Sequence, residues 1–391
     1  MANTDITRRT SLKLAIASCG LLMNPVLLAN AATDSRLVVI VLRGAMDGLD
    51  VVRPVGDPHL STLRPNLGNK PGPALTDFYQ LHPLASNLMP LWREESLAFV
   101  HAVATPYRDK RSHFEGQDFL ECGLSSIPTG VDKQSGWLNR FLASIPSHGP
   151  RTGFSVAREG EIILTGQAPI TRWFPKTNVN LSSQGQRLMA QMYEDDPLLH
   201  PTAAQAFELL EETKALRSKA GKGEAPLPGY LQVADYLAQQ LLGDTRVASF
   251  TINGWDTHKN QQNTLVRPMK ELTESLLHMR KTLGKTWDDT TILAITEFGR
   301  TARENGTGGT DHGTGGLMIM AGGGVRGGKV YGKWPGLGEG QLYQNRDLLP
   351  TVDVRRYVAG VSRGQFGISD SQVARIFPGV DMAVGVEDIV T

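Results

Sequence analysis

The chain has 391 residues, of which 40% are hydrophobic and 20% are charged, which is the composition of an ordinary globular protein. This length can bury a large core and allows one large α/β domain or two smaller ones. With 40 basic and 39 acidic side chains the formal net charge is +1, so the composition argues against nucleic acid as a partner.

The start of the chain has the pattern of an export signal. A basic segment with two adjacent arginines, TRRTSLK at 7–13, precedes an apolar stretch that ends in the small residues 29–31, ANA. This looks like a twin-arginine signal with a cleavage site. We therefore exclude residues 1–31 from the fold and expect passage through the twin-arginine translocase to the periplasm or the medium. A membrane anchor is the alternative, but Gly20 and Pro25 interrupt a run already shorter than the roughly 20 residues that a spanning helix needs, so we expect no stable anchor.

The first two predicted strands each lead into a loop with polar side chains. Residues 36–42 (RLVVIVL) are a continuous apolar run, typical of a strand buried on both faces of a parallel sheet, and residues 97–103 (LAFVHAV) are predicted as a second strand. Asp47 follows the first run, and Ser112 and His113 lie in the loop after the second. The other elements expected in this half are helices over 84–92 and 137–145 and a short strand over 161–164.

Charged amphipathic helices are expected between about residues 182 and 242. The clearest helical patterns cover 203–220 and 230–242, and a segment with prolines and glycines separates them. No long linker sets this region off. We interpret it as a helical insertion within a single α/β domain of residues 32–391.

The third predicted core strand, 247–252, ends shortly before an Asp-Thr-His sequence. Asp256 and His258 are two residues apart, so both side chains can point to one side of a locally extended backbone. Carboxylate and imidazole donors suit Zn²⁺, Mn²⁺ or a similar divalent ion. The alternative is a hydrogen bond between the two side chains that only holds the loop. A long amphipathic helix is predicted next, over 264–283.

The fourth strand, 291–296, turns abruptly at Glu297 into a glycine-rich segment, and we expect the rest of the chain to be arranged around it. Its glycines permit positive φ and close approach to a ligand. Arg300 follows in the same segment, and Asp311 and His312 lie between glycines. His312 is a candidate metal ligand, and Asp311 is a second ligand or a residue that orients it. A flexible surface loop with solvated charges is the alternative interpretation.

Strands that alternate with helices predict an α/β fold with a mostly parallel central sheet and helices on both faces. A further strand over 317–320 and a final helix over 348–359 complete it. In such sheets ligands bind beyond the carboxyl ends of the strands. The convergence of four such strand ends is what indicates a function; they carry Asp47, Ser112 with His113, Asp256 with His258, and Glu297.

Residues 323–329 match the pattern G-x-x-x-x-G-K of a phosphate-binding loop. Val330 stands where that loop needs Ser or Thr for its magnesium ion, and the segment lies near the end of the chain after a short strand. The match therefore does not predict nucleotide binding.

Several stretches resemble one family along nearly the whole mature chain. They are the twin-arginine start, LRGAMDGLD, RSHFEGQDFLECG, NGWDTHKNQ, TEFGRTARENGTGGTDHGTGG and YGKWPGL. In this order they resemble the exported bacterial family catalogued as domain of unknown function 1501, a resemblance that implies no particular activity. The layout is more distantly similar to the alkaline phosphatase and sulfatase superfamily. That similarity implies an alkaline-phosphatase-like sandwich with metal ligands and a hydroxyl-type nucleophile at the strand ends.

The superfamily resemblance implies a role for each candidate residue. One or two divalent ions, zinc foremost with manganese, calcium or magnesium as alternatives, would be held by Asp47, Asp256, His258, Glu297 and His312, with Asp311 nearby. Ser112 would be the nucleophile and His113 an acid/base or a ligand. The substrate would be a small anionic ester, which Arg300 would hold unless it pairs with Glu297.

The sequence departs from the superfamily pattern at three points. Asp256 and His258 are separated by one residue where the superfamily usually has three, Phe298 stands where it has a histidine ligand, and no recognisable signature surrounds the nucleophile. The resulting hypothesis is an exported, metal-dependent hydrolase of phosphate or sulfate esters. The alternative is a non-catalytic periplasmic protein that keeps the fold and acts in binding or envelope assembly.

Overall fold

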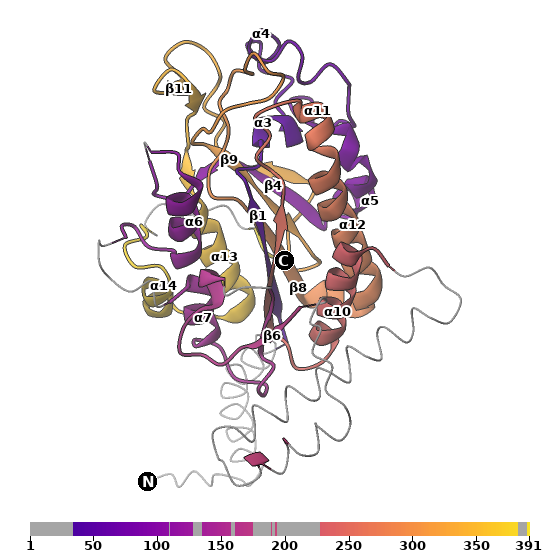
Figure 1. Cartoon of the computed structure of the whole chain (residues 1–391), viewed down its shortest axis with the longest axis vertical. Coiled ribbons are helices and arrows are strands. Elements are labelled where there is room, and N and C mark those ends of the chain that lie inside the picture. Colours follow the sequence, from indigo (N-terminus) through magenta and orange to yellow (C-terminus); the bar gives the residue numbers. More distant parts are fainter. Residues whose placement is uncertain are drawn as a thin grey trace, which may run out of the picture.

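Strand β1 (Arg36–Arg43) lies inside the sheet at the centre of this computed structural model (Figure 1). The structure describes residues 34–108, 110–127, 135–157, 161–174, 189, 192–193, 227–381 and 389–391. Within these residues nine strands form the sheet in the order β10-β4-β9-β8-β1-β7-β5-β6, and β13 pairs with β4. Neighbouring strands are parallel except at β9, which runs antiparallel to β4 and β8.

The other strands either complete this main sheet or form two short separate pairs. Those of the main sheet are β4 (Leu97–Ala104), β5 (Gly153–Val156), β6 (Thr171–Trp173), β7 (Val247–Asn253), β8 (Thr290–Ile295), β9 (Gly316–Ala321), β10 (Lys329–Tyr331) and β13 (Val352–Asp353). Two separate pairs are β2 (Val52–Arg53) with β3 (Gln80–Leu81), and β11 (Leu342–Tyr343) with β12 (Asp347–Leu348).

The side chains of β1 show why helices must cover both faces of the sheet. Ile40 and Leu42 belong to the apolar core on one face, whereas Val39 and Val41 belong to the core on the other. All four are completely buried, and each such side chain stabilises the fold by roughly 1.5–3 kcal/mol. A strand that is apolar at every position is therefore stable only between two helical layers.

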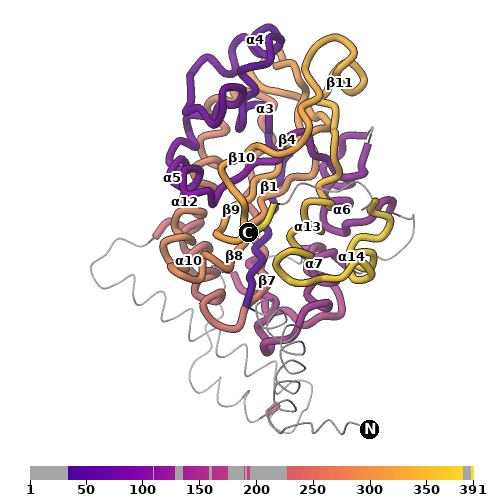
Figure 2. The backbone as a smooth tube through the Cα atoms, turned by 180° about the vertical axis from the view of Figure 1, so that it is seen from behind, coloured from indigo at the N-terminus to yellow at the C-terminus, as the bar shows by residue number. Residues whose placement is uncertain are grey.

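The two helical layers are visible from the front and from behind (Figures 1 and 2). One layer contains α5 (Met89–Arg93), α10 (Gly229–Leu242) and α12 (Val266–Leu283). The other contains α6 (His113–Cys122), α7 (Trp137–Leu142), α13 (Val354–Phe366) and α14 (Asp370–Ile376). The short helices are α3 (Gly48–Val51), α4 (Leu60–Leu63) and α11 (Gln261–Thr264), and the 3₁₀ helices are η1 (Pro83–Leu88), η2 (Ile162–Leu164) and η3 (Gly284–Asp289).

The predicted α/β class with a mostly parallel sheet is confirmed, and the four predicted core strands are β1, β4, β7 and β8. Two local predictions are wrong. Residues 161–164 do not form a strand: Ile163 is in η2, and its amide donates to the side chain of Glu121 instead of to a neighbouring strand. The final helix does not begin at 348, because that segment pairs in β12 and β13; it begins at Val354, where the Asp353 side chain caps it.

The end of the predicted helical insertion lies within the described residues, where α10 matches the expected helix over 230–242. The helix predicted over 203–220 and the export signal predicted over 1–31 lie outside the described residues. Among the helices that the structure describes, none has the length and apolar character needed to cross a bilayer.

His101 lies in β4 and is completely buried. Its Nε2 lies 2.8 Å from the carbonyl oxygen of Val52, its Nδ1 accepts from the amide of Ala102 at 3.2 Å, and its ring stacks on Tyr79. The neutral tautomer with the proton on Nε2 satisfies both contacts, whereas a second proton on Nδ1 would meet the Ala102 N–H. Burial lowers the pKa of His101 to about 4.

We expect His101 to make the fold sensitive to acid. In the unfolded chain its pKa returns to about 6.5, so between pH 6.5 and 4 the unfolded state binds more protons than the folded state. Stability that is fully present above pH 6.5 is therefore lost as the pH falls, by about 3 kcal/mol in total. His101→Phe should flatten the pH dependence of the urea unfolding free energy in this range, and His59→Gln, at an exposed position, should not. Equal slopes for His101→Phe and the wild type would contradict this expectation.

Candidate metal centre

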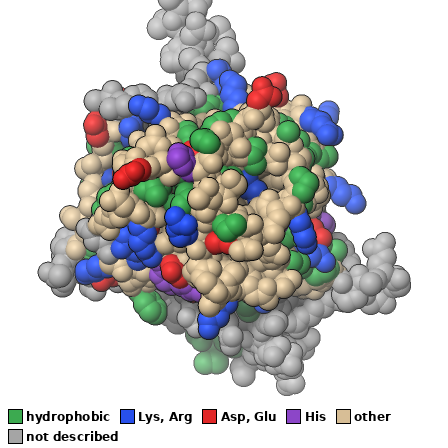
Figure 3. All heavy atoms as spheres, turned by 90° about the horizontal axis from the view of Figure 1, so that it is seen from above, with side chains coloured by type: hydrophobic (Ala, Val, Ile, Leu, Met, Phe, Trp, Pro, Cys, Tyr) green, Lys and Arg blue, Asp and Glu red, His purple; other side chains and the backbone are tan. Residues whose placement is uncertain are grey.

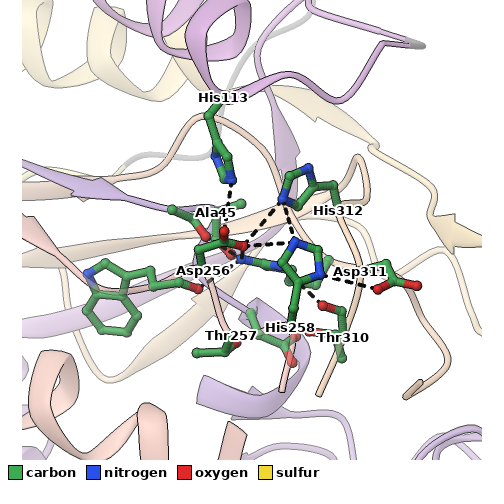
Figure 4. A network of polar contacts seen from close by, with 12 residues as sticks. Ala45, His113, Asp256, Thr257, His258, Thr310, Asp311 and His312 are labelled. Atoms are coloured by element: carbon green, nitrogen blue, oxygen red, sulfur yellow. Dashed lines mark hydrogen bonds and ion pairs between the residues drawn. The ribbon is translucent and has the colours of Figure 1, made fainter. Parts of the chain in front are cut away.

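Four side chains from three separate segments meet at the edge of the sheet where the parallel strands end (Figure 4). Asp256 and His258 follow β7, His312 precedes β9, and His113 is the first residue of α6. Because β9 runs antiparallel to β8, its beginning lies at the same edge as the end of β8. Figure 3 looks onto this edge and shows histidine and acidic side chains close together, with Lys and Arg side chains nearby.

Each of the three histidines is held at Nδ1 by an acceptor oxygen, which fixes the orientation of the ring and its tautomer. The contacts are His113 with Glu297 Oε1 at 2.8 Å, His258 with Asp311 Oδ1 at 3.3 Å, and His312 with the carbonyl oxygen of Arg111 at 2.8 Å. In each neutral ring the Nδ1–H donates to this oxygen. The Nε2 atom is then left with its lone pair.

The three Nε2 atoms face the carboxylate of Asp256 (Figure 4). Oδ1 of Asp256 lies 3.1 Å from His258 Nε2 and 3.3 Å from His312 Nε2, and Oδ2 lies 3.5 Å from His113 Nε2. The Nε2 atoms of His258 and His312 are 2.9 Å apart, and His113 Nε2 is buried without a hydrogen bond. In these tautomers none of the three Nε2 atoms carries a proton that it could donate to Asp256 or to another ring. A cation among them would satisfy all of them.

The donor set fits a divalent ion. Donor atoms of His113, Asp256 and His312 all lie within 4.8 Å of one another, and His258 adds a fourth donor through the contacts described above. Three imidazoles and one carboxylate match the ligands of zinc and similar transition metals better than the oxygen-rich sets of calcium and magnesium.

Arg300 lies beneath Asp256 and is fully buried. Its Nη2 donates to Asp256 Oδ1 at 2.6 Å. Its other hydrogen bonds go to backbone carbonyls on three segments, those of Gly44, Ala45, Trp255 and Thr310. A guanidinium placed in this way orients Asp256 and joins the segments that carry the site. The structure thus places Arg300 with Asp256, whereas the sequence suggested contact with a substrate or with Glu297.

The surroundings of the centre favour a carboxylate at Asp256 and a neutral imidazole at His312, which are the states that metal binding requires. Burial acts to raise the pKa of Asp256, but the Arg300 guanidinium outweighs it and holds the pKa below its ordinary value. Burial lowers the pKa of His312, and the nearby positive charges of His113 and Arg300 act in the same direction. The hydrogen bond to Glu297 raises the pKa of His113. Asp256 is therefore a carboxylate and His312 a neutral imidazole at neutral pH.

Glu297 and Asp311 lie behind the histidines that they hold. Glu297 is completely buried and also accepts from the Gly44 amide at 2.9 Å. Burial acts to raise the pKa of Glu297, but its hydrogen bonds with His113 and with backbone amides, together with the charge of His113, more than offset this and lower the pKa. Carboxylates in this position orient metal-binding imidazoles and increase their basicity. In this geometry both acidic residues support the ligands.

Asp47 lies in a separate buried network. Its Oδ2 accepts from Arg64 Nη1 at 2.7 Å and from Gln261 Nε2 at 2.6 Å, and the residue is 1% exposed. Its Oδ1 is buried without a hydrogen-bond partner. The guanidinium of Arg64 therefore already neutralises the negative charge that was expected to bind a metal ion.

Ser112 is the N-cap residue of α6 and directly precedes His113. Its backbone amide donates to Tyr107 Oη at 2.7 Å. Phe298 stacks on the His113 ring with centroids 5.2 Å apart, so the phenylalanine that replaces an expected histidine packs against a candidate ligand.

Two residues near the centre were not predicted from the sequence. Asn305 donates to Asp311 Oδ1 at 3.1 Å and to the His258 carbonyl at 2.9 Å, and Gln261 lies in the network of Asp47. Both are close in sequence to a predicted ligand, which is the signal that could have drawn attention to them. Amides are common in loops, so proximity alone would not have shown which of them are buried.

Close approach of the backbone requires glycine at two points of the site. Gly44 has φ +116°, and a Cβ atom there would lie 2.5 Å from the amide nitrogen of Asp256. A Cβ atom on Gly299 would lie 1.8 Å from the carbonyl oxygen of Gly315. These glycines let the segments that carry the ligands lie directly against each other.

In the loop that matches G-x-x-x-x-G-K, the backbone amides form hydrogen bonds within the protein. The N–H groups of Gly323, Gly324, Gly327 and Gly328 all donate to backbone carbonyls. They are therefore committed to the fold of the loop and are not directed at a phosphate.

A family model described as "Protein of unknown function (DUF1501)" matches residues 110–377. No curated protein matches the chain in sequence. Among solved structures, Ps i-CgsB in complex with k-i-k-neocarrahexaose has a TM-score of 0.42 at 11% identity, with 86% of this chain and 73% of that chain covered.

Two further structures are similar at the same low level. A protein in the alkaline phosphatase superfamily from Vibrio parahaemolyticus has a TM-score of 0.35 at 14% identity, with 73% of this chain and 60% of that chain covered. The alkaline phosphatase from the Antarctic bacterium TAB5 has a TM-score of 0.33 at 12% identity, with 88% and 98% covered. TM-scores below 0.5 add nothing to the chemistry inferred from the site itself.

Proposed function

This chain belongs to the family described as protein of unknown function (DUF1501), and within that family we propose that it is an exported, metal-dependent hydrolase of phosphate or sulfate esters. The observation that carries the proposal is the convergence of His113, His258 and His312 on Asp256, with each Nδ1 held by an acceptor oxygen. Export is proposed from the twin-arginine pattern at the start of the sequence.

A divalent ion bound here, zinc foremost, would polarise an ester oxygen and lower the pKa of a water molecule. We propose a single ion, because the centre offers one group of converging donors and Asp47 is already paired with Arg64. Asp256 supplies the negative charge of the ligand set, and Arg300 fixes the position of its Oδ1.

Two guanidiniums beside His312 support an anionic substrate. Arg346 Nη1 donates to the His312 carbonyl at 2.8 Å, and the Arg111 carbonyl accepts from His312 Nδ1. The side chains of Arg111 and Arg346 each lie 2.9 Å from the buried carboxylate of Asp347, and they remain 20% and 40% exposed. Both guanidiniums reach the rim of the centre, where they would attract a phosphate or sulfate group.

Ser112 is the hydroxyl that we assign to a covalent step, if the reaction has one. It lies next to His113 at the start of α6, and its hydroxyl makes no capping hydrogen bond to the helix. A hydroxyl that is not used as a cap is available for chemistry. Ser112→Ala would then abolish any covalent phosphoryl- or sulfuryl-enzyme, detected by mass spectrometry of the quenched reaction.

The test of this function is turnover of 4-nitrophenyl phosphate and 4-nitrophenyl sulfate by protein supplied with zinc, manganese, calcium or magnesium. We expect one ester class to be hydrolysed and Asp256→Asn to abolish the activity. Arg111→Gln and Arg346→Gln should raise KM about tenfold or more, because each removes a charged hydrogen-bond donor. Arg303→Gln is the matched control, since Arg303 is exposed in the same glycine-rich segment. A protein that binds metal but turns over no ester would favour the non-catalytic binding alternative.

A further inference from the structure

Gln261 is a completely buried glutamine at the start of α11. Its Nε2 donates to Asp47 Oδ2 at 2.6 Å and to Asp50 Oδ2 at 2.9 Å. Its Oε1 accepts from the hydroxyls of Thr257 at 2.8 Å and Thr310 at 2.9 Å. Both donor hydrogens and both acceptor positions of the amide are therefore used.

The two threonines belong to the two loops that carry the metal ligands (Figure 4). Thr257 lies between Asp256 and His258, and Thr310 lies two residues before His312. The loops also contact each other directly, because the Thr310 amide donates to the Thr257 carbonyl at 3.2 Å. One side-chain oxygen thus joins the loop after β7 to the loop before β9.

The other end of the Gln261 amide is anchored on two neutralised carboxylates. Asp47 pairs with Arg64 at 2.7 Å, and Asp50 pairs with Arg53 at 2.7 Å, and all four side chains are buried. Their charges balance within the network. These buried ion pairs and the two hydrogen bonds from Nε2 hold the amide against Asp47, after β1, and Asp50, in α3.

We propose that Gln261 is a positioning residue that sets the distance between the two loops of the metal centre, and thereby its affinity for the ion. The proposal rests on the function proposed above. Only an amide can donate to two carboxylates and accept from two hydroxyls at once. A glutamate at 261 would place a third carboxylate against Asp47 and Asp50, and a methionine would leave four buried groups without their partner.

The test measures zinc affinity by competition with a chromophoric chelator, together with the visible absorption spectrum of the Co²⁺ form. Thr257→Val and Thr310→Val each remove one hydrogen bond to Gln261, and Gln261→Met removes all four. We expect about 10- to 100-fold weaker zinc binding and an altered Co²⁺ spectrum, with the largest effect for Gln261→Met, as for other residues that orient metal ligands. The valine variants decide the matter if Gln261→Met does not fold.

The matched control is Thr290→Val. Thr290 is completely buried, and its hydroxyl donates to the Thr286 carbonyl at 2.7 Å at the start of β8, at the opposite edge of the sheet. Thr290→Val should lose stability as Thr257→Val and Thr310→Val do, but it should keep the wild-type zinc affinity and Co²⁺ spectrum. Wild-type affinity and spectrum in all Gln261-network variants would overturn this inference alone. A wild-type protein that takes up no metal would overturn the proposed function with it.

Discussion

One divalent ion per chain is the expected result of elemental analysis on the folded protein, and Asp256→Ala and His312→Ala are expected to lose it. Asp256 is the one carboxylate toward which all three Nε2 atoms are directed, at 3.1 to 3.5 Å. His312 contacts both Asp256 and His258. Removing Asp256 takes the negative charge out of the donor set, and removing His312 takes out the donor that contacts two others, so zinc should bind far more weakly to either variant.

Two control variants make this measurement specific. His278→Ala removes an imidazole that lies 2.8 Å from Asp235, an Asp-His pair on α10 and α12 outside the candidate centre, and should keep the ion. Asp47→Asn should also keep one ion per chain, although with weaker affinity, because Asp47 is paired with Arg64 and acts on the centre only through Gln261. Two ions per chain, one of them lost in Asp47→Asn, would contradict the single-ion centre. A protein that stays metal-free when offered zinc, manganese and calcium would contradict the hydrolase proposal as a whole.

Arg300→Met is expected to cause a large loss of stability, about 3–5 kcal/mol in urea unfolding, because several buried backbone carbonyls lose their hydrogen-bond donor. The guanidinium has no exposed surface, and its loss would leave the Asp256 carboxylate and several backbone carbonyls without their donor. Because Asp256 would no longer be held, metal binding should weaken in any molecules that still fold.

Arg303→Met is the control for this second measurement. Arg303 is exposed three residues further along the same segment, so its replacement should change stability by no more than about 0.5 kcal/mol. A loss below about 1 kcal/mol in Arg300→Met would show that water or other side chains replace the guanidinium. In that case Arg300 would be available for a different role in the centre.

Much of the fold could be predicted because the local hydrophobic pattern of the sequence matches the burial of the same residues in the structure. The run that became β1 is apolar at successive positions between its terminal arginines, and such a strand is stable only inside a sheet covered on both faces. The direction of β9 could not be predicted in this way. An apolar strand has the same hydrophobic pattern whether it runs parallel or antiparallel to its neighbours. Likewise, the start of α13 depends on the pairing of β12 with the nearby β11 and of β13 with the distant β4.

The candidate site was likewise predicted only in part. Position after a core strand and glycine-rich surroundings singled out Asp256, His258, Glu297 and His312, and the loop after the second strand singled out His113. Which of these converge depends on contacts between residues far apart in the chain, such as His113 with Glu297. Asp47 pairs with Arg64, and the sequence around Arg64 did not predict this ion pair.

The sequence by itself determined the layered α/β fold, the family and the set of polar residues at the strand ends, because periodicity and motif are local properties of the chain. Only the tertiary structure decided what each of those residues contacts. It directed three Nε2 atoms at Asp256, placed Arg300 beneath that carboxylate, and paired Asp47 with Arg64. The physical reason is that the role of an ionisable side chain depends on its burial and its nearest charges, and both arise only when distant segments pack together.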